Sequence, residues 1–381
     1  MSVPFAEAFK GKRVLVTGHT GFKGSWLAIW LHRLGARVSG YALPPENTPS
    51  NFVASNVAGL LEHDIVADIR DAHRFEQALR DIRPDVVLHL AAQALVRVGY
   101  ETPRETFDVN VMGTVNVLDA LRRVGHPCVC VVITSDKCYE NREQVWGYRE
   151  TDAMGGYDPY SASKGCAELV VSSMRRSYFP PRELLRHQVK VASARAGNVI
   201  GGGDWARDRI VTDLMKSIVE GRPVEVRSPA SVRPWQHVLE PLSGYLQLAA
   251  RMLESDDPRW LEGWNFGPVT GVEMPVSDLV EQLIAAWGEG SWVDVSGAAA
   301  PHEARVLRLS IDKAMVDLGW RPRWSTARAL LHLARWYRRF YREDAVDMRA
   351  ACEADIEAYE QAALVGDDAV DALAGVRAGV Q

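Results

Sequence analysis

The sequence has no hydrophobic run long enough to cross a membrane. None of its 381 residues lies in a stretch of about 18 consecutive apolar residues, which a membrane span requires. Residues 1–12 contain Pro4, Glu7 and Lys10 and no apolar core, so we expect no signal peptide there. Since 47% of the residues are hydrophobic, the composition is that of a globular protein with one or two domains.

Cysteine is scarce, and its spacing does not suggest metal binding. The five cysteines are an odd number without a C-x-x-C pair, which argues against a disulfide framework and a zinc site. They are Cys128, Cys130, Cys138, Cys166 and Cys352. We therefore expect a reducing, cytoplasmic setting and no metal centre.

A dense basic patch is also missing. The net charge is −5, and residues 343–381 contain ten acidic and two basic residues, which leaves about +3 for the rest of the chain by subtraction. This mild excess favours an anionic small molecule as partner over nucleic acid, for which basic residues interleaved with aromatics would be expected.

A glycine-rich turn stands near the start of the chain. Residues 13–17 are β-rich, Gly18, Gly21 and Gly24 follow at G-x-x-G-x-x-G spacing, and residues 25–31 predict a helix. Strand, glycine turn and helix together are typical of a dinucleotide cradle, in which the helix amino terminus attracts the pyrophosphate. A plain glycine turn is the alternative.

The expected second and third strands leave the choice of cofactor open. Residues 37–41 form the second strand, but no Asp or Glu follows it to bind a ribose diol, so NADP is not excluded. We predict loose cofactor binding for the same reason; a purified sample already saturated with NAD would contradict this. The third strand, residues 64–69, contains Asp68, which suits either adenine or a helix N-cap.

Two further strands are expected to supply site residues. Residues 85–92 end in small side chains that allow a cofactor to pass closely, and residues 127–133 read as a buried central strand. The latter places Asp136 and Lys137 at the carboxyl end of the sheet, where open α/β sheets bind ligands; a solvated loop is the alternative. Between these strands, residues 104–121 predict one helix with an apolar stripe.

Tyr160 and Lys164 share one face of a predicted helix. Asp158-Pro159 is a strong helix start, and side chains four residues apart lie a turn apart. A phenol can act as a base near pH 7 if its pKa falls by about 3 units, or about 4 kcal/mol. An ammonium about 4 Å away supplies an amount of this order. Taken alone, this spacing also arises by chance on many helices.

Residues 188–196 predict another strand, followed by a glycine turn and an arginine-rich segment. Guanidinium groups suit phosphate oxygens, although exposed arginines are also common on ordinary surfaces. The arginines are Arg207, Arg209, Arg222, Arg227 and Arg233.

Five motifs together resemble the extended short-chain dehydrogenase/reductase family and, within it, the 4,6-dehydratases that act on CDP-D-glucose. They are Thr17-Gly18-His19-Thr20-Gly21-Phe22-Lys23-Gly24, Thr134-Ser135-Asp136-Lys137-Cys138-Tyr139, Tyr160-Ser161-Ala162-Ser163-Lys164, Arg195-Ala196-Gly197-Asn198 and Arg233-Pro234-Trp235-Gln236-His237-Val238. The likeness covers roughly residues 9–340.

The resemblance implies a dehydratase that oxidises C4, removes water across C5 and C6, and reduces C6 with internally recycled NAD. Tyr160 would be the base at the C4 hydroxyl, Lys164 would hold the nicotinamide ribose, Ser135 would bond the C4 oxygen, and Asp136 would be the acid at C6. Other cofactor contacts would be Gly18, Thr20, Gly21, Phe22, Gly24, Asp68, Ile69, Leu90, Ala91, Ala92 and Thr134. Substrate contacts would be Gln93, Asn198, Arg209, Arg233, Trp235 and His237.

Lys137 departs from the dTDP-glucose dehydratases, which have Glu at this position. A lysine with its ordinary pKa costs about 4 to 5 kcal/mol to deprotonate at pH 7. It could act as the base at C5 or stay charged and stabilise the enolate, and both roles stay open.

The resemblance also implies a domain plan and a homodimer. We expect a doubly wound, mostly parallel Rossmann-type α/β domain over residues 1–195, with 236–272 returning to it. A smaller C-terminal α/β lobe over 196–235 and 273–342 would bind the nucleotide sugar, and 343–381 would be an acidic tail, helical to about residue 363. The homodimer would form through the helices starting near Arg104 and Tyr160. The alternatives to the dehydratase function are a nucleotide-sugar 4-epimerase, a dehydratase for another nucleotide sugar, and an NAD(P)-sensing binding protein.

Overall fold

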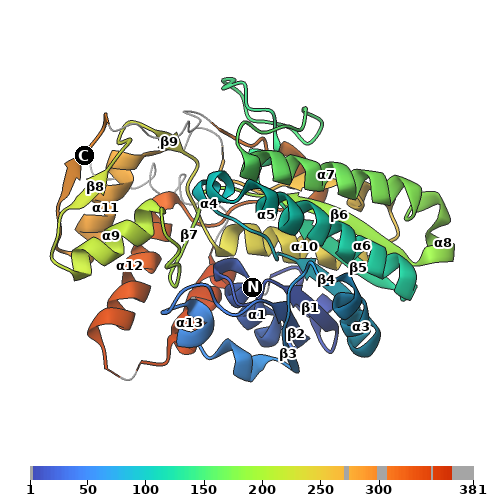
Figure 1. The fold of residues 1–381 in the computed structure, drawn as a ribbon. Helices are drawn as coiled ribbons and strands as arrows, with labels where there is room; N and C mark the ends of the chain where they lie inside the picture. Colours follow the sequence, from blue (N-terminus) through green and yellow to red (C-terminus); the bar gives the residue numbers. More distant parts are fainter. Residues whose placement is uncertain (1–2, 270–273, 298–306, 345, 363–381) are drawn as a thin grey trace, which may run out of the picture.

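A seven-stranded sheet forms the centre of the molecule (Figure 1). The structure is a computed structural model that describes residues 3–269, 274–297, 307–344 and 346–362. The strand order is β11-β6-β5-β4-β1-β2-β3, and all neighbouring strands are parallel. Their bounds are β1 Arg13–Thr17, β2 Arg37–Ala42, β3 His63–Val66, β4 Val86–His89, β5 Cys128–Ile133, β6 Val189–Arg195 and β11 Gly263–Asn265. This order confirms the expected doubly wound fold.

Helices cover both faces of the sheet, which explains why its central strands are apolar throughout. Successive side chains of β1 point to opposite faces: Val14 and Val16 join the core under α1 and α10, whereas Leu15 joins the core under α3, α6 and α7. The bounds are α1 Phe22–Arg33, α3 Ala72–Ile82, α6 Gly113–Val124, α7 Pro159–Ser177 and α10 Leu239–Glu254.

The single helix expected over residues 104–121 is interrupted. The structure has α5 Pro103–Phe107, a π-helical turn Asp108–Met112, and then α6. The Asn110 side chain accepts a hydrogen bond from the Gln93 amide at 2.9 Å and donates to its carbonyl at 3.0 Å. The extra residue of the π-turn therefore ties this helix to the loop after β4, an arrangement frequent at functional sites.

A smaller lobe lies beside the sheet (Figure 1). It contains α9 Ile210–Val219, β8 Val224–Val226, α11 Val276–Trp287, β13 Trp292–Asp294 and α12 Thr326–Arg342. Strands β8 and β13 pair in parallel, and α11 packs against α12. We keep the expected domain boundaries as a proposal, supported by β11, which brings residues 263–265 back to the large sheet.

The acidic segment after this lobe packs into the main core. The sequence predicts that its helix begins at residue 344, whereas in the structure α13 spans Met348–Gln361. The helix begins there because the Asp347 side chain accepts a hydrogen bond from the Ala350 amide and so caps its amino terminus. Trp30 of α1 donates a hydrogen bond to Glu360 at 2.8 Å, and Tyr359 donates one to Glu240 of α10 at 2.7 Å. The segment up to Ala362 is thus part of the core, and residues 363–381, expected to fray, lie outside the described residues.

The remaining elements are short. The helices are α2 Asn51–Ala54, α4 Val96–Glu101 and α8 Leu184–His187, with a second π-turn at Ala314–Leu318. Short 3-10 turns span Ala6–Phe9, Val57–Leu60, Asp136–Cys138, Pro181–Glu183 and Pro258–Trp260. Two small strand pairs join β7 Val199–Ile200 with β10 Gln236–His237, and β9 Val232–Arg233 with β12 Met274–Pro275.

Candidate active site

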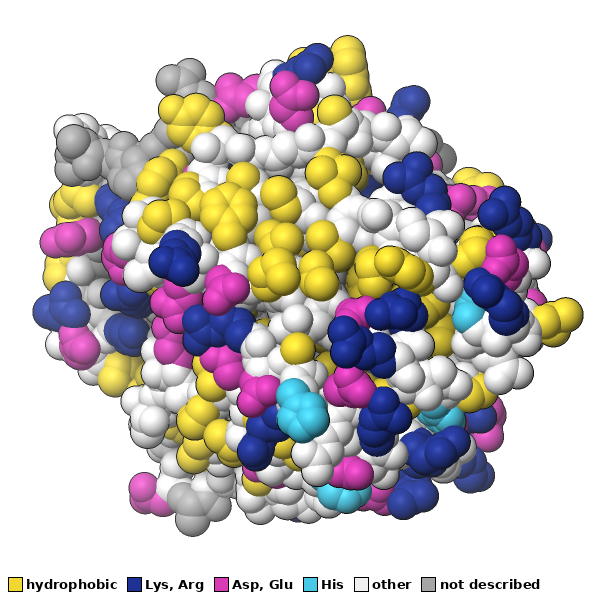
Figure 2. Space-filling model, turned by 45° about the vertical axis from the view of Figure 1, so that its right-hand side comes forward, with side chains coloured by type: hydrophobic (Ala, Val, Ile, Leu, Met, Phe, Trp, Pro, Cys, Tyr) yellow, Lys and Arg dark blue, Asp and Glu magenta, His cyan; other side chains and the backbone are white. Residues whose placement is uncertain are grey.

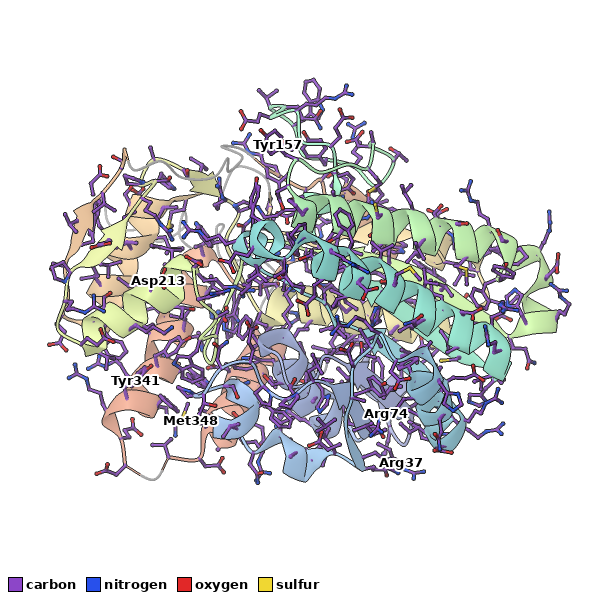
Figure 3. All side chains as sticks on the ribbon, viewed as in Figure 1. Arg37, Arg74, Tyr157, Asp213, Tyr341 and Met348 are labelled. Carbon is purple, nitrogen blue, oxygen red and sulfur yellow. The ribbon has the colours of Figure 1, made fainter. Side chains whose placement is uncertain are left out.

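One large cavity lies at the carboxyl ends of the central strands, between the sheet and the smaller lobe. Its volume is about 1520 Å³. Figure 3 labels two of the residues that line it, Tyr157 on the loop before α7 and Asp213 on α9. The cavity brings together all the predicted site residues but one: Gly18, Thr20, Gly21, Phe22, Gly24, Asp68, Ile69, Leu90, Ala91, Ala92, Gln93, Thr134, Ser135, Asp136, Lys137, Tyr160, Lys164, Asn198, Arg209, Arg233 and Trp235.

The exception is His237, which lies in the core beneath the cavity. Its ring is fully buried, 5.9 Å edge-on from Trp26 and 4.8 Å from Trp324, and burial lowers its pKa well below the ordinary value. Its Nδ1 accepts the Leu239 amide hydrogen bond at 3.3 Å at the start of α10. The motif therefore placed His237 correctly along the chain, but its ring packs against Trp26 and Trp324 and does not line the cavity. We therefore no longer propose it as a substrate contact.

Two positions of the turn after β1 have room only for glycine. Gly18 has φ +74°, and a Cβ there would lie 2.8 Å from the Ala91 nitrogen. A Cβ on Gly24 would lie 2.1 Å from the Gly18 carbonyl oxygen. The loop therefore brings bare backbone to the amino terminus of α1, where free amide groups and the helix dipole favour phosphate. These residues fit the pyrophosphate of a dinucleotide.

The acidic groups near the second and third strands have other partners. The Asp64 carboxylate forms a hydrogen bond with Nε2 of the buried His19 ring, at 2.8 Å. Asp68 lines the cavity, but its carboxylate is held by Arg70, and the residue that caps α3 is Asp71. Glu46, which follows β2 after Pro44-Pro45, also lines the cavity, so an acid does lie in this region.

The segment after β5 forms a compact polar cluster. Ser135 donates a hydrogen bond to Asp136 at 2.9 Å, and Asn198 donates one to the other Asp136 oxygen at 3.3 Å. Asp136 is buried and rests on Gly197, where a Cβ would come within 1.9 Å of its carboxylate. Lys137 follows on the same 3-10 turn, half-buried at the cavity wall.

Helix α7 begins as expected, because the Asp158 side chain accepts hydrogen bonds from the Ser161 amide at 3.0 Å and its hydroxyl at 2.5 Å. Tyr160 and Lys164 are both buried at the cavity wall. Burial lowers the pKa of Lys164 to about 8, against an opposing effect of Glu168.

The pKa of Tyr160 differs from the sequence-based expectation. Burial raises it to about 12; a hydrogen bond with Ser135 and the charge of Arg209 lower it, while Asp136 raises it further. Helical spacing alone did not reveal how strongly a buried phenol resists ionisation.

A buried ion pair anchors α7 to the sheet. Arg195 of β6 donates a hydrogen bond to Glu168 of α7 at 2.7 Å, and both side chains are almost fully buried. Thr134 and Ser193 donate to the two oxygens of the same carboxylate, at 2.5 and 2.7 Å. This network holds the helix with Tyr160 and Lys164 directly against the end of β5.

The expected phosphate ligands lie on the lobe side of the cavity. Arg209 precedes α9 and forms an ion pair of 2.6 Å with Asp204, which raises the pKa of its guanidinium. The Trp235 indole donates to the Met274 carbonyl at 3.3 Å. The Gln93 side chain donates a hydrogen bond to the Thr106 hydroxyl and accepts one from the Leu95 amide, so it stabilises the loop on which it lies.

The polar residues of the cavity wall that sequence reasoning missed include Lys23, Glu46, Tyr157 and Asp204. The sequence did contain a signal for two of them. Lys23 is a cation within the glycine-rich turn, and Asp204 is an acidic residue directly after three consecutive glycines. Glu46 and Tyr157 stand in loops whose course only the fold defines.

Within the described part of the chain, no helix is long and apolar enough to span a membrane. The same residues contain no group of three or more metal-binding side chains.

Comparisons with known proteins agree with this arrangement. The family described as GDP-mannose 4,6 dehydratase matches residues 15–331. The CDP-glucose 4,6-dehydratase of Salmonella typhimurium is 48% identical over 355 residues, which are 93% of this chain and 98% of that protein. The dTDP-glucose 4,6-dehydratase of Streptomyces antibioticus is 28% identical, over 85% of this chain and 92% of that protein.

Among solved structures, DesIV, a dTDP-glucose 4,6-dehydratase from Streptomyces venezuelae with NAD and TYD bound, matches with a TM-score of 0.74 and 24% identity. The match covers 87% of this chain and 99% of that one. A UDP-glucose 4-epimerase from Thermotoga maritima matches with a TM-score of 0.72 and 23% identity, over 86% and 99%. These structures share the fold.

Proposed function

The chain belongs to the GDP-mannose 4,6 dehydratase family, and from this premise we propose that it converts CDP-D-glucose to CDP-4-keto-6-deoxy-D-glucose and water. The proposal of CDP-D-glucose as substrate is supported by the 48% identity to the Salmonella enzyme. The observation that carries it is the position of Asp136 and Ser135 beside Tyr160 in one cavity. A dehydratase needs such an acid in addition to the base at C4.

The proposed cofactor is NAD. Its pyrophosphate fits the bare turn of Gly18 and Gly24 and the amino terminus of α1, as described above. When bound, it supplies the hydride acceptor for C4, the hydride for C6, and a positive charge near the phenol. The expectation of loose binding stays a prediction, but Glu46, which follows β2 and lines the cavity, weakens its ground, because an acid does lie in this region.

In the proposed reaction, side chains of this chain move the protons. Tyr160 takes the proton of the C4 hydroxyl, and Ser135, which bonds the phenol, holds the same oxygen. The C4 ketone makes the C5 proton removable. Asp136 then gives a proton to the C6 hydroxyl, which leaves as water. Asn198, Arg209 and Arg233 hold the diphosphate, and Lys137 acts at C5 in one of the two roles described above.

An experiment with three substrates tests the proposal. We expect turnover of CDP-glucose in deuterated water to be much faster than that of dTDP-glucose or GDP-glucose, with deuterium appearing at C5 of the product. A 4-epimerase would leave C5 untouched, and a cofactor-sensing protein would release no product. Faster turnover of another nucleotide sugar would keep the reaction class but overturn the choice of nucleobase.

We also propose that the protein acts as a homodimer in the cytoplasm. Large apolar side chains are exposed on α5, the following π-turn and α7: Phe107 is 36% exposed, Met112 47% and Leu169 59%. Figure 2 shows hydrophobic side chains gathered on one face of the molecule. All five cysteines are free, which supports a reducing compartment.

Replacing Leu169 by glutamate should break this dimer. A charge on the apolar face costs desolvation in the interface, so we expect light scattering to give the mass of one 42.3 kDa chain instead of two. Val316→Glu, at an apolar residue that is 80% exposed on the second π-turn, is the matched control and should stay dimeric. A wild-type protein of monomer mass would exclude the dimer.

A further inference from the structure

Lys23 is a cation that the proposed reaction does not use. It is the second residue of α1, within the glycine turn, and it lines the cavity. Its ammonium lies 6.0 Å from the centre of the buried Tyr245 ring on α10. The side chain therefore extends from the cofactor cradle along the cavity wall toward Tyr245 of α10.

The charges around Lys23 are mixed, and the acidic ones are engaged elsewhere. Arg209 and Lys164 disfavour its protonated form, whereas Asp136 and Asp204 favour it. Asp204 is paired with Arg209 at 2.6 Å, and Asp136 accepts from Ser135 and Asn198. Among the residues that the structure describes, none forms a hydrogen bond or ion pair with the Lys23 ammonium.

The position of the Lys23 ammonium favours the binding of an anion. It stands at a helix amino terminus, which is itself partly positive, and beside Arg209. An enclosed charge without a partner is unfavourable, and an anionic ligand would remove that cost. We propose that the Lys23 ammonium binds the diphosphate group of a ligand in this cavity. This inference rests on the proposed function, which brings two diphosphate diesters to the site.

The binding should be linked to a proton. Burial and the charge of Arg209 lower the pKa of Lys23 to about 7, so near neutral pH part of the molecules carry a neutral amine before the ligand binds. A nearby diphosphate raises this pKa, so binding takes up a fraction of a proton near neutral pH. The affinity should fall as the pH rises above 7, because the amine must then be protonated on binding.

The diphosphate has two possible sources, which share their chemistry. The amino terminus of α1 favours the cofactor, and Arg209 favours the nucleotide sugar. ADP-ribose and CDP-glucose represent them, and as diesters both lack the phosphate group that titrates near pH 6 in monoesters.

Calorimetric titration in buffers of different ionisation enthalpy measures this proton directly. Each ligand is titrated into full-length protein with Tyr160→Phe, which prevents turnover, alone and combined with Lys23→Met, Lys23→Arg or Lys12→Met. We expect a fraction of a proton to be taken up near neutral pH with one of the ligands, which identifies the source. Lys23→Met should abolish this uptake and weaken that ligand about tenfold or more.

The other variants separate charge from structure. Lys23→Arg should keep the affinity without proton uptake, because a guanidinium stays protonated. Lys12→Met, at an exposed lysine, should change neither. Unchanged affinity for both ligands in Lys23→Met would overturn the inference while leaving the proposed function intact, as would proton uptake that persists in Lys23→Arg. Failure of both ligands to bind would contradict the proposed function and this inference together. If Lys23→Met does not fold, Lys23→Arg decides the outcome.

Discussion

Replacing Tyr160 by phenylalanine is expected to slow CDP-glucose turnover by about 10²- to 10⁴-fold, the usual contribution of a general acid–base group. With a pKa of about 12 in the ligand-free site, a phenolate at pH 7 costs about 7 kcal/mol. The phenol nevertheless forms a hydrogen bond with Ser135. Its loss should remove the first oxidation itself.

A single turnover with excess enzyme separates this effect from later steps. Absorbance of the reduced nicotinamide should not rise in Tyr160→Phe, even briefly. Tyr178→Phe is the matched control, because this tyrosine ends the same helix and is 47% exposed. If Tyr160→Phe forms reduced cofactor at the wild-type rate, another group takes the C4 proton and the assignment is wrong.

Replacing Asp136 by asparagine should block the reaction one step later. Asparagine keeps the shape and can still accept the Ser135 hydrogen bond, but it cannot protonate the leaving C6 oxygen. We expect oxidation at C4 to continue while water release slows by about 10²- to 10⁴-fold. Reduced cofactor should therefore accumulate, and mass spectrometry of the quenched sugar should show the unreacted C6 hydroxyl.

Two further variants help to interpret this result, one as a control and one as a test of the role at C5. Asp152→Asn, on the loop between β5 and α7, should dehydrate at the wild-type rate. Lys137→Ala addresses the open role at C5: full solvent exchange at C5 in this variant would exclude Lys137 as the base. Normal dehydration by Asp136→Asn would show that the acid is another residue.

The parts of the site that sequence reasoning predicted correctly depend on local chemistry. Glycines that approach Ala91, the Asp158 cap and the apolar run of β5 carry their own signals in a few residues. Together they define where the strands end, and hence the edge at which ligands bind.

The parts that it missed depend on contacts between distant segments. The π-turn before α6 exists because Asn110 bonds the loop of Gln93. His237 turned inward because Trp26 and Trp324 fill the space around it. The pKa values of Tyr160 and Lys23 are set by burial, which no spacing of residues along a helix specifies.

The place of α13 constrains how the protein is made. Trp30, in the first helix, is covered by Tyr359 and Glu360, which the ribosome adds more than three hundred residues later. The amino-terminal half therefore emerges with part of its apolar surface still open to water, although domains otherwise fold as they are synthesised. Completion of the nucleotide-binding half must wait for nearly the whole chain to be translated.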